Sequence, residues 1–285
     1  MQPFMQPPAS IGVVSPVRSP ECMMVMQDFL HACEQSGMLA YEYGRHTQND
    51  PVLGKPDMLI CLGGDGTILS LSAFAAQHHI VLGGINMGHL GFLTACARED
   101  IHTLVACLAN GNYGVESRAM LSVSQQGSVS AEKTEPLLAL NEISLMRDQT
   151  GRMIDVDVEL DGCLLNRYHA DGVLVATPTG STAYSLSAGG PLLWPSAGVM
   201  CLTPICPHSL TSRPVVLPDD VEVTLRPRER RGRAGESLIY SIDGHDTRPI
   251  ALNETLVIRK ADTALRLLNL PNSDYAARLR AKLGW

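Results

Sequence analysis

The apolar run Met58–Cys61 leads directly into Leu62-Gly63-Gly64-Asp65-Gly66-Thr67, and this junction limits the possible folds of the chain more than any other segment. A buried strand followed by a glycine-rich turn is typical of a parallel sheet whose next element is a helix. Glycines let the backbone approach an anion closely, and the unpaired N–H groups of such a turn can bind a phosphate.

A second segment of this kind, Thr177-Pro178-Thr179-Gly180-Ser181-Thr182-Ala183-Tyr184, lies more than a hundred residues further on. It also follows an apolar run and is rich in glycine and hydroxyl groups. Only the first segment carries a carboxylate, that of Asp65. A carboxylate among phosphate-binding glycines is well placed only if it meets a metal or a substrate hydroxyl. The pair of segments therefore indicates phosphoryl transfer to an alcohol.

The composition predicts a packed globular protein of one large or two ordinary domains, since the 285 residues are 45% hydrophobic and 18% charged. The formal net charge of −7 argues against nucleic-acid binding. No apolar run approaches the roughly 18 residues of a membrane span, and no secretory signal is visible, so we expect no membrane partner. The eight cysteines form neither a CxxC pair nor a zinc-type cluster, which predicts a cytoplasmic protein without an all-protein metal site.

Residues 1–114 alternate between apolar strand patterns and helical patterns, which predicts an α/β domain with a parallel, doubly wound sheet. We expect Thr67 to cap the helix that follows the glycine-rich turn. The expected strands lie at 11–14, 58–62 and 80–85, and the expected helices at 20–37, 67–78 and 99–110.

Residues 115–270 contain mostly short strand patterns separated by turn signals such as Asp161-Gly162 and Asp243-Gly244, and predict a second, β-rich domain. The expected strands are 119–124, 137–146, 153–160, 163–169, 173–177, 221–225, 238–242 and 255–259. The remaining segment, 271–285, contains a helix pattern, and we expect this helix to pack back on the first domain.

The turn Gly63–Thr67 is neither a Walker A loop, which needs Gly-Lys-Ser/Thr, nor a GxGxxG dinucleotide fingerprint. The alternative to a phosphoryl-transfer site is an ordinary strand–helix turn in which Asp65 only caps the helix. Two adjacent glycines with a third at Gly66 favour the functional interpretation.

Gly63–Thr67 resembles the signature shared by NAD kinases, by diacylglycerol and sphingosine-type lipid kinases and, more loosely, by phosphofructokinases. Three further segments resemble the NAD kinases in particular. They are Asn86-Met87-Gly88-His89-Leu90-Gly91-Phe92-Leu93, Leu140-Asn141-Glu142, and Asp171-Gly172 with Thr177–Tyr184 and Gly189-Gly190-Pro191. On these motifs, which follow one another in order from Met58 to Asp246, the chain is identified as a member of the bacterial-type NAD kinases.

The resemblance implies an NAD kinase-like fold, with a Rossmann-like N-terminal α/β domain containing a parallel sheet and an all-β C-terminal domain. It also implies that Asp65 contacts the adenosine ribose and acts as the base toward its 2′-hydroxyl. Phosphates would be bound by Gly64, Gly66 and Thr67.

The nucleotide-binding roles implied by the resemblance fall on both domains. Asn141 would bind the adenine base, Glu142 the ribose hydroxyls, and Phe92 would line the adenine pocket. Without the resemblance, Phe92 is as readily explained by core packing and the Asn-Glu pair by a surface turn. The residues implied at the nicotinamide end are Asp171, Thr182, Ala183 and Tyr184, among which Tyr184 offers a ring to stack and a hydroxyl to bond.

Two histidines are further candidates. His245 falls where the family places a residue near the diphosphate and reactive ribose, a position at which many relatives carry Gln. His169 precedes Ala170-Asp171, a segment that in this family can face the ligand of a neighbouring subunit. For each of them an ordinary structural histidine is the alternative.

The implied reaction moves the terminal phosphoryl of ATP, or of polyphosphate, to the 2′-hydroxyl of NAD and yields NADP. Mg²⁺ would neutralise the donor phosphates. The partners would be the small molecules NAD and ATP, within a homodimer or homotetramer. The alternatives are a lipid kinase of the same superfamily, which shares the Asp65 turn, and a non-catalytic NAD-binding sensor.

Overall fold

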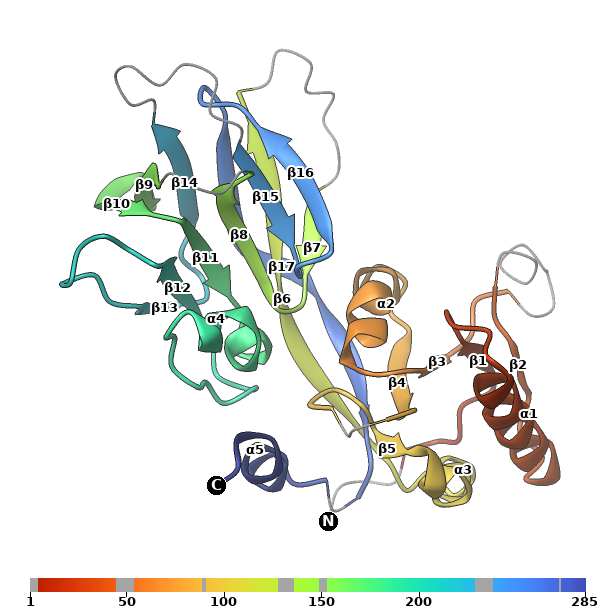
Figure 1. Cartoon of the computed structure of the whole chain (residues 1–285). Helices are drawn as coiled ribbons and strands as arrows, with labels where there is room; N and C mark the ends of the chain where they lie inside the picture. The colour runs from red at the N-terminus through yellow and green to blue at the C-terminus, as the bar shows by residue number, and fades with distance from the viewer. Residues whose placement is uncertain are drawn as a thin grey trace. The chain divides into compact units, whose positions relative to one another are not determined.

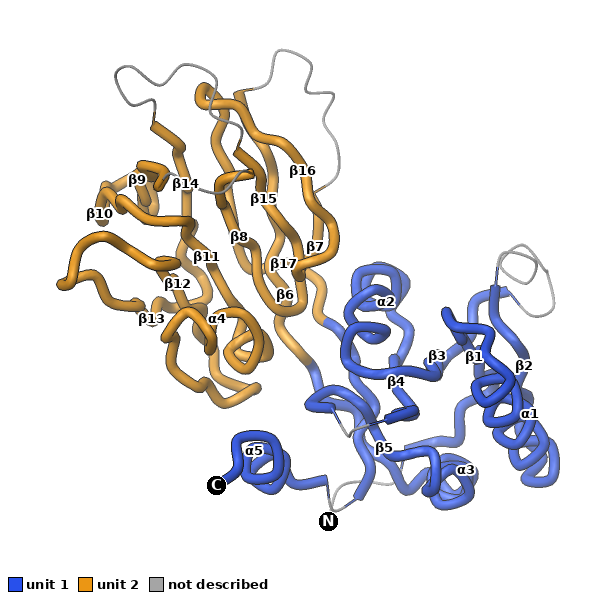
Figure 2. The backbone as a smooth tube through the Cα atoms, in the orientation of Figure 1, with its two compact units in different colours: residues 1–117, 265–285 blue, residues 118–264 orange. Residues whose placement is uncertain are grey.

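The structure is a computed structural model that describes residues 5–44, 54–88, 91–127, 136–148, 153–228, 238–271 and 273–285. The chain forms two compact units (Figure 2). Unit 1 comprises Met1–Ser117 with Leu265–Trp285, and unit 2 comprises Arg118–Ala264. The division predicted from the sequence lies at residues 114 and 270.

Unit 1 contains the parallel sheet that the sequence predicts, with the strand order β4-β3-β1-β2 (Figure 1). These strands are β1 (Ile11–Val14), β2 (Ala40–Glu42), β3 (Met58–Leu62) and β4 (Val81–Asn86). All neighbours in this order are parallel. The short β5 (Cys96–Ala97) also pairs with β4, as does the end of β17 (Thr255–Asn269) through Arg266 and Leu267.

The helices of unit 1 are α1 (Pro20–Gln35), α2 (Asp65–Gln77), α3 (Ile101–Ala109), preceded by the short η1 (Arg98–Asp100), and α5 (Tyr275–Leu283). Helix α1 begins as the sequence predicts, because the Ser19 side chain accepts the N–H of Cys22 and Pro20 occupies the first helical position. Its buried Phe29 belongs to the same apolar core as Leu104 of α3.

The beginning of α2 differs from the prediction. Its N-cap is Gly64, which forms no side-chain cap, and Asp65 is already helical. Thr67 lies inside the first turn, where its N–H bonds to Gly64 O at 3.0 Å. The prediction that Thr67 caps this helix is therefore wrong, and the glycine turn ends two residues earlier than expected.

Unit 2 is built from β-sheets, as predicted. One sheet has the order β13-β12-β11-β8-β15-β16, and all its neighbours are antiparallel. Its strands are β8 (Glu142–Arg147), β11 (Gly172–Ala176), β12 (Val199–Ile205), β13 (Val215–Pro218), β15 (Leu238–Ile242) and β16 (Asp246–Ile250). The short helices η2 (Thr179–Thr182) and α4 (Tyr184–Ser187) follow β11.

The second set of strands in unit 2 pairs antiparallel in the order β10-β9-β14-β17. It includes β9 (Ile154–Leu160), β10 (Cys163–Ala170) and β14 (Val223–Arg228), while β6 (Gly114–Gln126) pairs with β17 and with β7 (Leu137–Ala139). One apolar core contains buried side chains of both strand sets, such as Val156 and Val175.

The single strand expected over 137–146 is instead two strands. β7 ends at Ala139 and pairs with β6, whereas β8 begins at Glu142 and pairs with β11 and β15. The cause lies in the backbone between them, because the N–H groups of Leu140, Asn141 and Glu142 bond to the carboxylate of Asp243.

In the ranges that the structure describes, no helix combines the length and the apolar character needed to cross a bilayer.

Candidate functional site

The carboxylate of Asp65 is held by a turn of the chain that follows β4. Oδ2 accepts the N–H of Phe92 at 2.8 Å, and Oδ1 accepts the N–H of Leu93 at 3.0 Å. Hydrogen bonds to a carboxylate are stronger than those between neutral groups. The half-buried Asp65 side chain is therefore fixed in one orientation at the end of the parallel sheet where β3 meets α2.

Two glycines are required by this packing. A Cβ at Gly91 would lie 1.9 Å from Asp65 Oδ1, and a Cβ at Gly63 would lie 2.2 Å from Thr67 Oγ1. Both distances are far inside van der Waals contact, so a larger residue at either position would displace the side chain facing it. The neighbouring residues His89 and Leu90 of the sequence motif lie outside the described residues.

Gly64 and Gly66 have the opposite environment. A Cβ at either position would meet no heavy atom of the described chain within 4 Å. Packing within the chain therefore does not demand a glycine at either position. The open space lies at the N-terminus of the 13-residue helix α2, where N–H groups and the helix dipole favour an anion. The phosphate-binding roles of Gly64, Gly66 and Thr67 stay predictions.

Phe92 connects the Asp65 turn to α5. Its ring centroid lies 6.2 Å from that of Tyr275, at an interplanar angle of 49°. Its carbonyl oxygen accepts Arg278 Nη1 at 2.8 Å, and Nη2 of the same guanidinium donates to Ser273 at 3.0 Å. The segment that positions Asp65 is thus itself bonded to the C-terminal helix of unit 1.

In unit 2, Asn141 and Glu142 stand where β8 begins, beside the ends of β11 and β15. Glu142 is paired with Ala176 of β11, and its carbonyl accepts the N–H of Asp243 at 2.9 Å. The carbonyl of Asn141 accepts the N–H of Thr177 at 2.8 Å. These bonds bring the predicted Asn-Glu pair together with the beginning of the predicted segment 177–184.

The side chain of Glu142 is buried, with 5% of the residue exposed. Its Oε2 has no hydrogen-bond partner among the described residues. Burial, together with the nearby charge of Asp243, raises the pKa of Glu142 to about 8, against the effect of a bond from the backbone of Tyr184. At pH 7 most Glu142 in the free protein is therefore neutral and can donate as well as accept a hydrogen bond.

The hydroxyl groups of segment 177–184 are used within the segment and its neighbours. Thr177 Oγ1 donates to Leu140 O at 2.6 Å and accepts the N–H of Gly180 at 3.0 Å. Ser181 Oγ donates to Pro178 O at 2.7 Å. Thr182 Oγ1 donates to Thr179 O at 3.2 Å. This turn is closed by its own side chains.

Tyr184 and Asp171 lie at the same end of unit 2. Burial is the main cause that raises the pKa of the Tyr184 phenol, with smaller contributions from the nearby Cys206, Asp171 and Glu142. Asp171 forms an ion pair with Arg147, Oδ2 to Nη2, at 3.1 Å. Tyr184 is 38% exposed, so its ring can receive a ligand. The nicotinamide-end roles of Asp171, Thr182, Ala183 and Tyr184 stay predictions.

The two histidines differ in their surroundings. His245 is exposed in the turn between β15 and β16, where its Nδ1 lies 3.2 Å from Asp243 O. His169 lies on β10, with Nδ1 2.7 Å from Asp155 Oδ1 and its ring centroid 5.7 Å from that of His208. Neither geometry tests the role predicted for the residue.

Sequence reasoning missed four residues that hold these groups in place: Asp243, Gly91, Gly180 and Arg278. Asp243 was interpreted only as part of an Asp-Gly turn, and Gly91 only as part of a motif. A Cβ at Gly180 would lie 2.1 Å from Asn141 O. Each of these contacts joins residues far apart in the sequence, and no local pattern carries such information.

Among the described residues, no group of three or more His, Cys, Asp or Glu side chains could hold a metal ion. The donor set near Asp65 agrees with this, because both carboxylate oxygens already accept N–H groups. A divalent ion at this place would need most of its oxygen ligands from a substrate and water.

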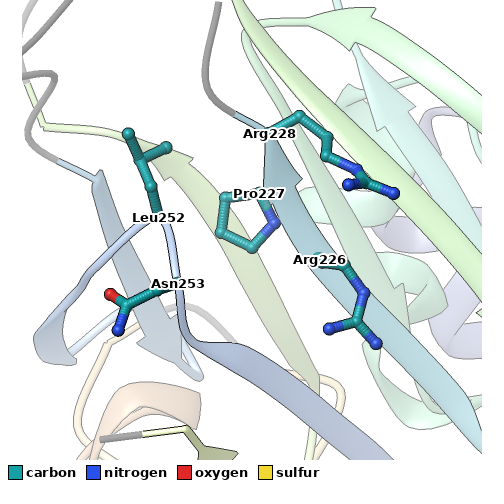
Figure 3. Close-up of a pocket in the computed structure, with 5 residues that line it drawn as sticks. All are labelled: Arg226, Pro227, Arg228, Leu252 and Asn253. Atoms are coloured by element: carbon teal, nitrogen blue, oxygen red, sulfur yellow. The ribbon is translucent and has the colours of Figure 1, made fainter.

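A cavity of about 380 Å³ lies elsewhere in unit 2, beside β14 (Figure 3). The two arginines on its wall, Arg226 and Arg228, extend away from Leu252 and Asn253 on the opposite wall. Arg226 pairs with Glu159 and Arg228 with the buried Asp157. None of the predicted site residues is among the described residues that line this cavity.

The sequence matches two family models, the ATP-NAD kinase N-terminal domain over residues 25–113 and the ATP-NAD kinase C-terminal domain over residues 140–270. The NAD kinase of Flavobacterium johnsoniae is 38% identical to this chain over 263 residues, which are 92% of this chain and 87% of that protein.

Two solved structures share the fold. Yeast NADH kinase complexed with NADH superposes with a TM-score of 0.84 and 22% sequence identity, covering 100% of this chain and 89% of that chain. An NAD kinase from Archaeoglobus fulgidus in complex with ATP gives a TM-score of 0.75 and 24% identity, covering 96% of this chain and 98% of that chain.

Proposed function

The chain belongs to the NAD kinase family and is a kinase, and we propose that it transfers the terminal phosphoryl of ATP to the 2′-hydroxyl of the adenosine ribose of NAD. The products are NADP and ADP. ATP as the donor is supported by the Archaeoglobus fulgidus relative, an NAD kinase in complex with ATP.

In this reaction Asp65 takes the proton of the 2′-hydroxyl while the 2′-oxygen forms a bond to the terminal phosphorus of ATP. The bond between that phosphorus and the oxygen retained by ADP breaks. The observation that carries this proposal is the fixed carboxylate of Asp65 beside the open space at Gly64 and Gly66. A positioned base typically contributes about 10²–10⁴-fold to a rate.

Mg²⁺ enters this proposal together with ATP, bound to the donor phosphates. It would neutralise charge that develops on the transferred group. The residues of this chain then contribute N–H groups at the beginning of α2 and the oriented carboxylate of Asp65, so that catalysis rests on positioning and electrostatics.

The nucleotide would be recognised by Asn141 at the adenine base and by Glu142 at the ribose hydroxyls. A neutral Glu142 suits this role, because it can donate a hydrogen bond to one hydroxyl oxygen and accept one from another. Phe92 would contribute to the adenine pocket and His245 to the diphosphate site. Asp171, Thr182, Ala183 and Tyr184 would contact the nicotinamide end.

The experiment that tests the function is incubation of the pure protein with NAD and Mg-ATP. NADP is read with an NADP-specific dehydrogenase. The proposal expects NADP to form at a steady rate and EDTA to abolish it. If no NADP forms with ATP, polyphosphate and then NADH replace ATP and NAD in turn. If no combination gives a phosphorylated dinucleotide, the proposed function is refuted.

A homo-oligomeric state and a cytoplasmic location are parts of the same proposal. The location is supported by eight cysteines that are all free thiols, as expected in a reducing compartment. Native mass spectrometry tests the assembly, and a monomer at micromolar concentration would contradict it.

A further inference from the structure

Asp243 belongs to an Asp-Gly turn in the sequence, but in the structure its side chain points inward. The residue is 8% exposed and has a φ of +50°. Its Oδ2 accepts the N–H of Leu140 at 2.9 Å, and its Oδ1 accepts the N–H groups of Asn141 at 2.7 Å and Glu142 at 3.1 Å. One carboxylate thus satisfies three consecutive backbone donors.

This contact replaces sheet pairing at the point where β7 ends and β8 begins. The backbone of Asp243 adds a fourth bond, from its N–H to Glu142 O at 2.9 Å. On the other side, Asn141 O accepts the N–H of Thr177. The Asn141-Glu142 backbone is therefore fixed by Asp243 on one side and by Thr177 on the other.

The charge of Asp243 also acts on the Glu142 side chain. It is the second-largest influence that raises the pKa of Glu142, after burial. The pKa of Asp243 is itself raised by burial, against the three N–H donors and the nearby His245. The ionisable groups that act on this pair are thus Asp243, Glu142, His245 and, at the edge of the group, Tyr184.

We propose that Asp243 is a positioning residue for nucleotide binding, which holds Asn141 and Glu142 in the geometry that NAD requires. The proposal rests on the proposed function, since it takes NAD to be the ligand of the Asn-Glu pair. Asp243 acts through these two residues and needs no contact of its own with the nucleotide.

The test is Asp243→Asn, which keeps the size of the side chain and suits a positive φ. The amide presents an NH₂ group to one of the three backbone donors, so one bond is lost and the geometry of the pair relaxes. We expect the NAD dissociation constant to rise at least about tenfold. The ATP dissociation constant and kcat at saturating NAD should stay within about threefold of wild type.

Asp161→Asn is a matched control. Asp161 also belongs to an Asp-Gly turn and has a φ of +48°. It is exposed and its Oδ1 accepts a single backbone N–H, that of Glu222 at 3.0 Å. Its substitution should leave NAD binding unchanged. An equal loss of NAD affinity in both variants would overturn the proposal, because it would indicate a general effect of such turns on the fold.

The pH dependence of NAD binding provides a readout that a purely structural role would not move. In wild type the dissociation constant should change across the titration of Glu142 near pH 8, and in Asp243→Asn this change should shift to lower pH because the neighbouring negative charge is gone. An unshifted profile with wild-type affinity overturns the proposal.

Two further comparisons keep the test decisive. If Asp243→Asn shows no cooperative unfolding transition, Asp243→Ser, which retains one short acceptor, takes its place under the same criteria. If wild type binds NAD but forms no NADP, the kinase proposal fails, while a selective loss of NAD binding in Asp243→Asn still supports the positioning role.

Discussion

The two glycine-rich segments that look alike in the sequence are opposites in the structure. In Leu62–Thr67 the glycines Gly64 and Gly66 border open space, and the carboxylate is held by a segment that follows the next strand. In Thr177–Tyr184 the hydroxyls of Ser181 and Thr182 bond within the turn, that of Thr177 bonds to Leu140 O, and residues 177–181 are buried. In the first segment the glycines leave open space at the beginning of α2, whereas residues 177–181 of the second segment pack within the chain.

The glycines show what this difference means. Gly66 contacts nothing that a methyl group would disturb, whereas Gly180 lies where a methyl group would overlap the carbonyl of Asn141. A glycine-rich turn after a strand therefore has two unrelated explanations, close approach of a ligand and close approach of the chain itself. Their consequences for substitution differ, and they can be measured.

The largest effect is expected from Asp65→Asn. The variant keeps the shape of the side chain but cannot accept the proton of the 2′-hydroxyl, so NADP formation should fall by at least about 100-fold. NAD binding, measured by calorimetry, should persist. Asp28→Asn, on the exposed face of α1, is the control that should keep full turnover. Near-normal turnover of Asp65→Asn would remove Asp65 from the catalytic role.

Replacing a glycine by alanine should have a smaller effect. The free energy of unfolding should change in opposite directions in the two segments. Gly180→Ala should lower the free energy of unfolding by about 1–3 kcal/mol, because the new methyl group overlaps Asn141 O. Gly66→Ala, inside α2, should raise it by up to about 1 kcal/mol, since alanine is the better helix former.

The same pair of variants separates folding from function. Gly66→Ala should weaken ATP use while its melting temperature stays at or above that of wild type. If Gly66→Ala is as active as wild type, the phosphate-binding role of Gly66 is refuted. If Gly180→Ala melts like wild type, the internal role of the second segment is wrong.

The smallest effect is expected from the pH dependence of stability that the buried carboxyl group of Glu142 produces. The folded-state pKa of Glu142, about 8, lies above its ordinary value of 4.5, so the contribution of Glu142 to stability is present in full below pH 4.5 and is lost as the pH rises toward 8. Glu142→Gln removes this loss. Its melting temperature relative to wild type should therefore rise between pH 5.5 and pH 8.5.

We expect this relative change to be at least about 2–4 °C, which is the shift that each roughly 1 kcal/mol produces in a protein of this size. Differential scanning calorimetry at the two pH values makes the measurement. If the difference in melting temperature between variant and wild type is the same at both pH values, the pKa of Glu142 does not change on folding.

Much of the fold follows from the sequence because its strands are continuous apolar runs or alternate strictly. β3 and β4 are buried along their whole length, as parallel strands in the middle of a sheet must be. The NAD kinase fold and the kinase activity were likewise within reach, since several motifs agree in order along the chain.

Two of the strands that the sequence analysis does not predict, β12 and β16, break the rules used to find strands. β12 contains Pro204, which argues against an interior strand. The structure accommodates it because β13 pairs only with Val199–Leu202, so the proline lies beyond that pairing. β16 is a polar edge strand with neither an apolar run nor an alternating pattern.

The residues that support the candidate site could not be predicted from the sequence, for another reason. Asp243 bonds to Asn141, which lies about a hundred positions earlier in the sequence. Gly91 makes room for the side chain of Asp65, although the whole of β4 lies between the two residues in the sequence. An Asp-Gly pair in the sequence predicts a turn equally well at Asp161 and at Asp243, although only one of the two carboxylates is buried. Which of them turns inward depends on what the rest of the fold places beside it.

The discontinuity of unit 1 has a consequence for the order of events during biosynthesis. Residues 118–264 form unit 2 as one uninterrupted stretch, whereas unit 1 needs Leu265–Trp285 to complete it. Arg266 and Leu267 supply a strand partner for β4, and Arg278 supplies the bond to the turn that holds Asp65. On the ribosome, the unit that is begun first is therefore finished last, and the Asp65 turn gains its final support only after every residue of unit 2 has been synthesised.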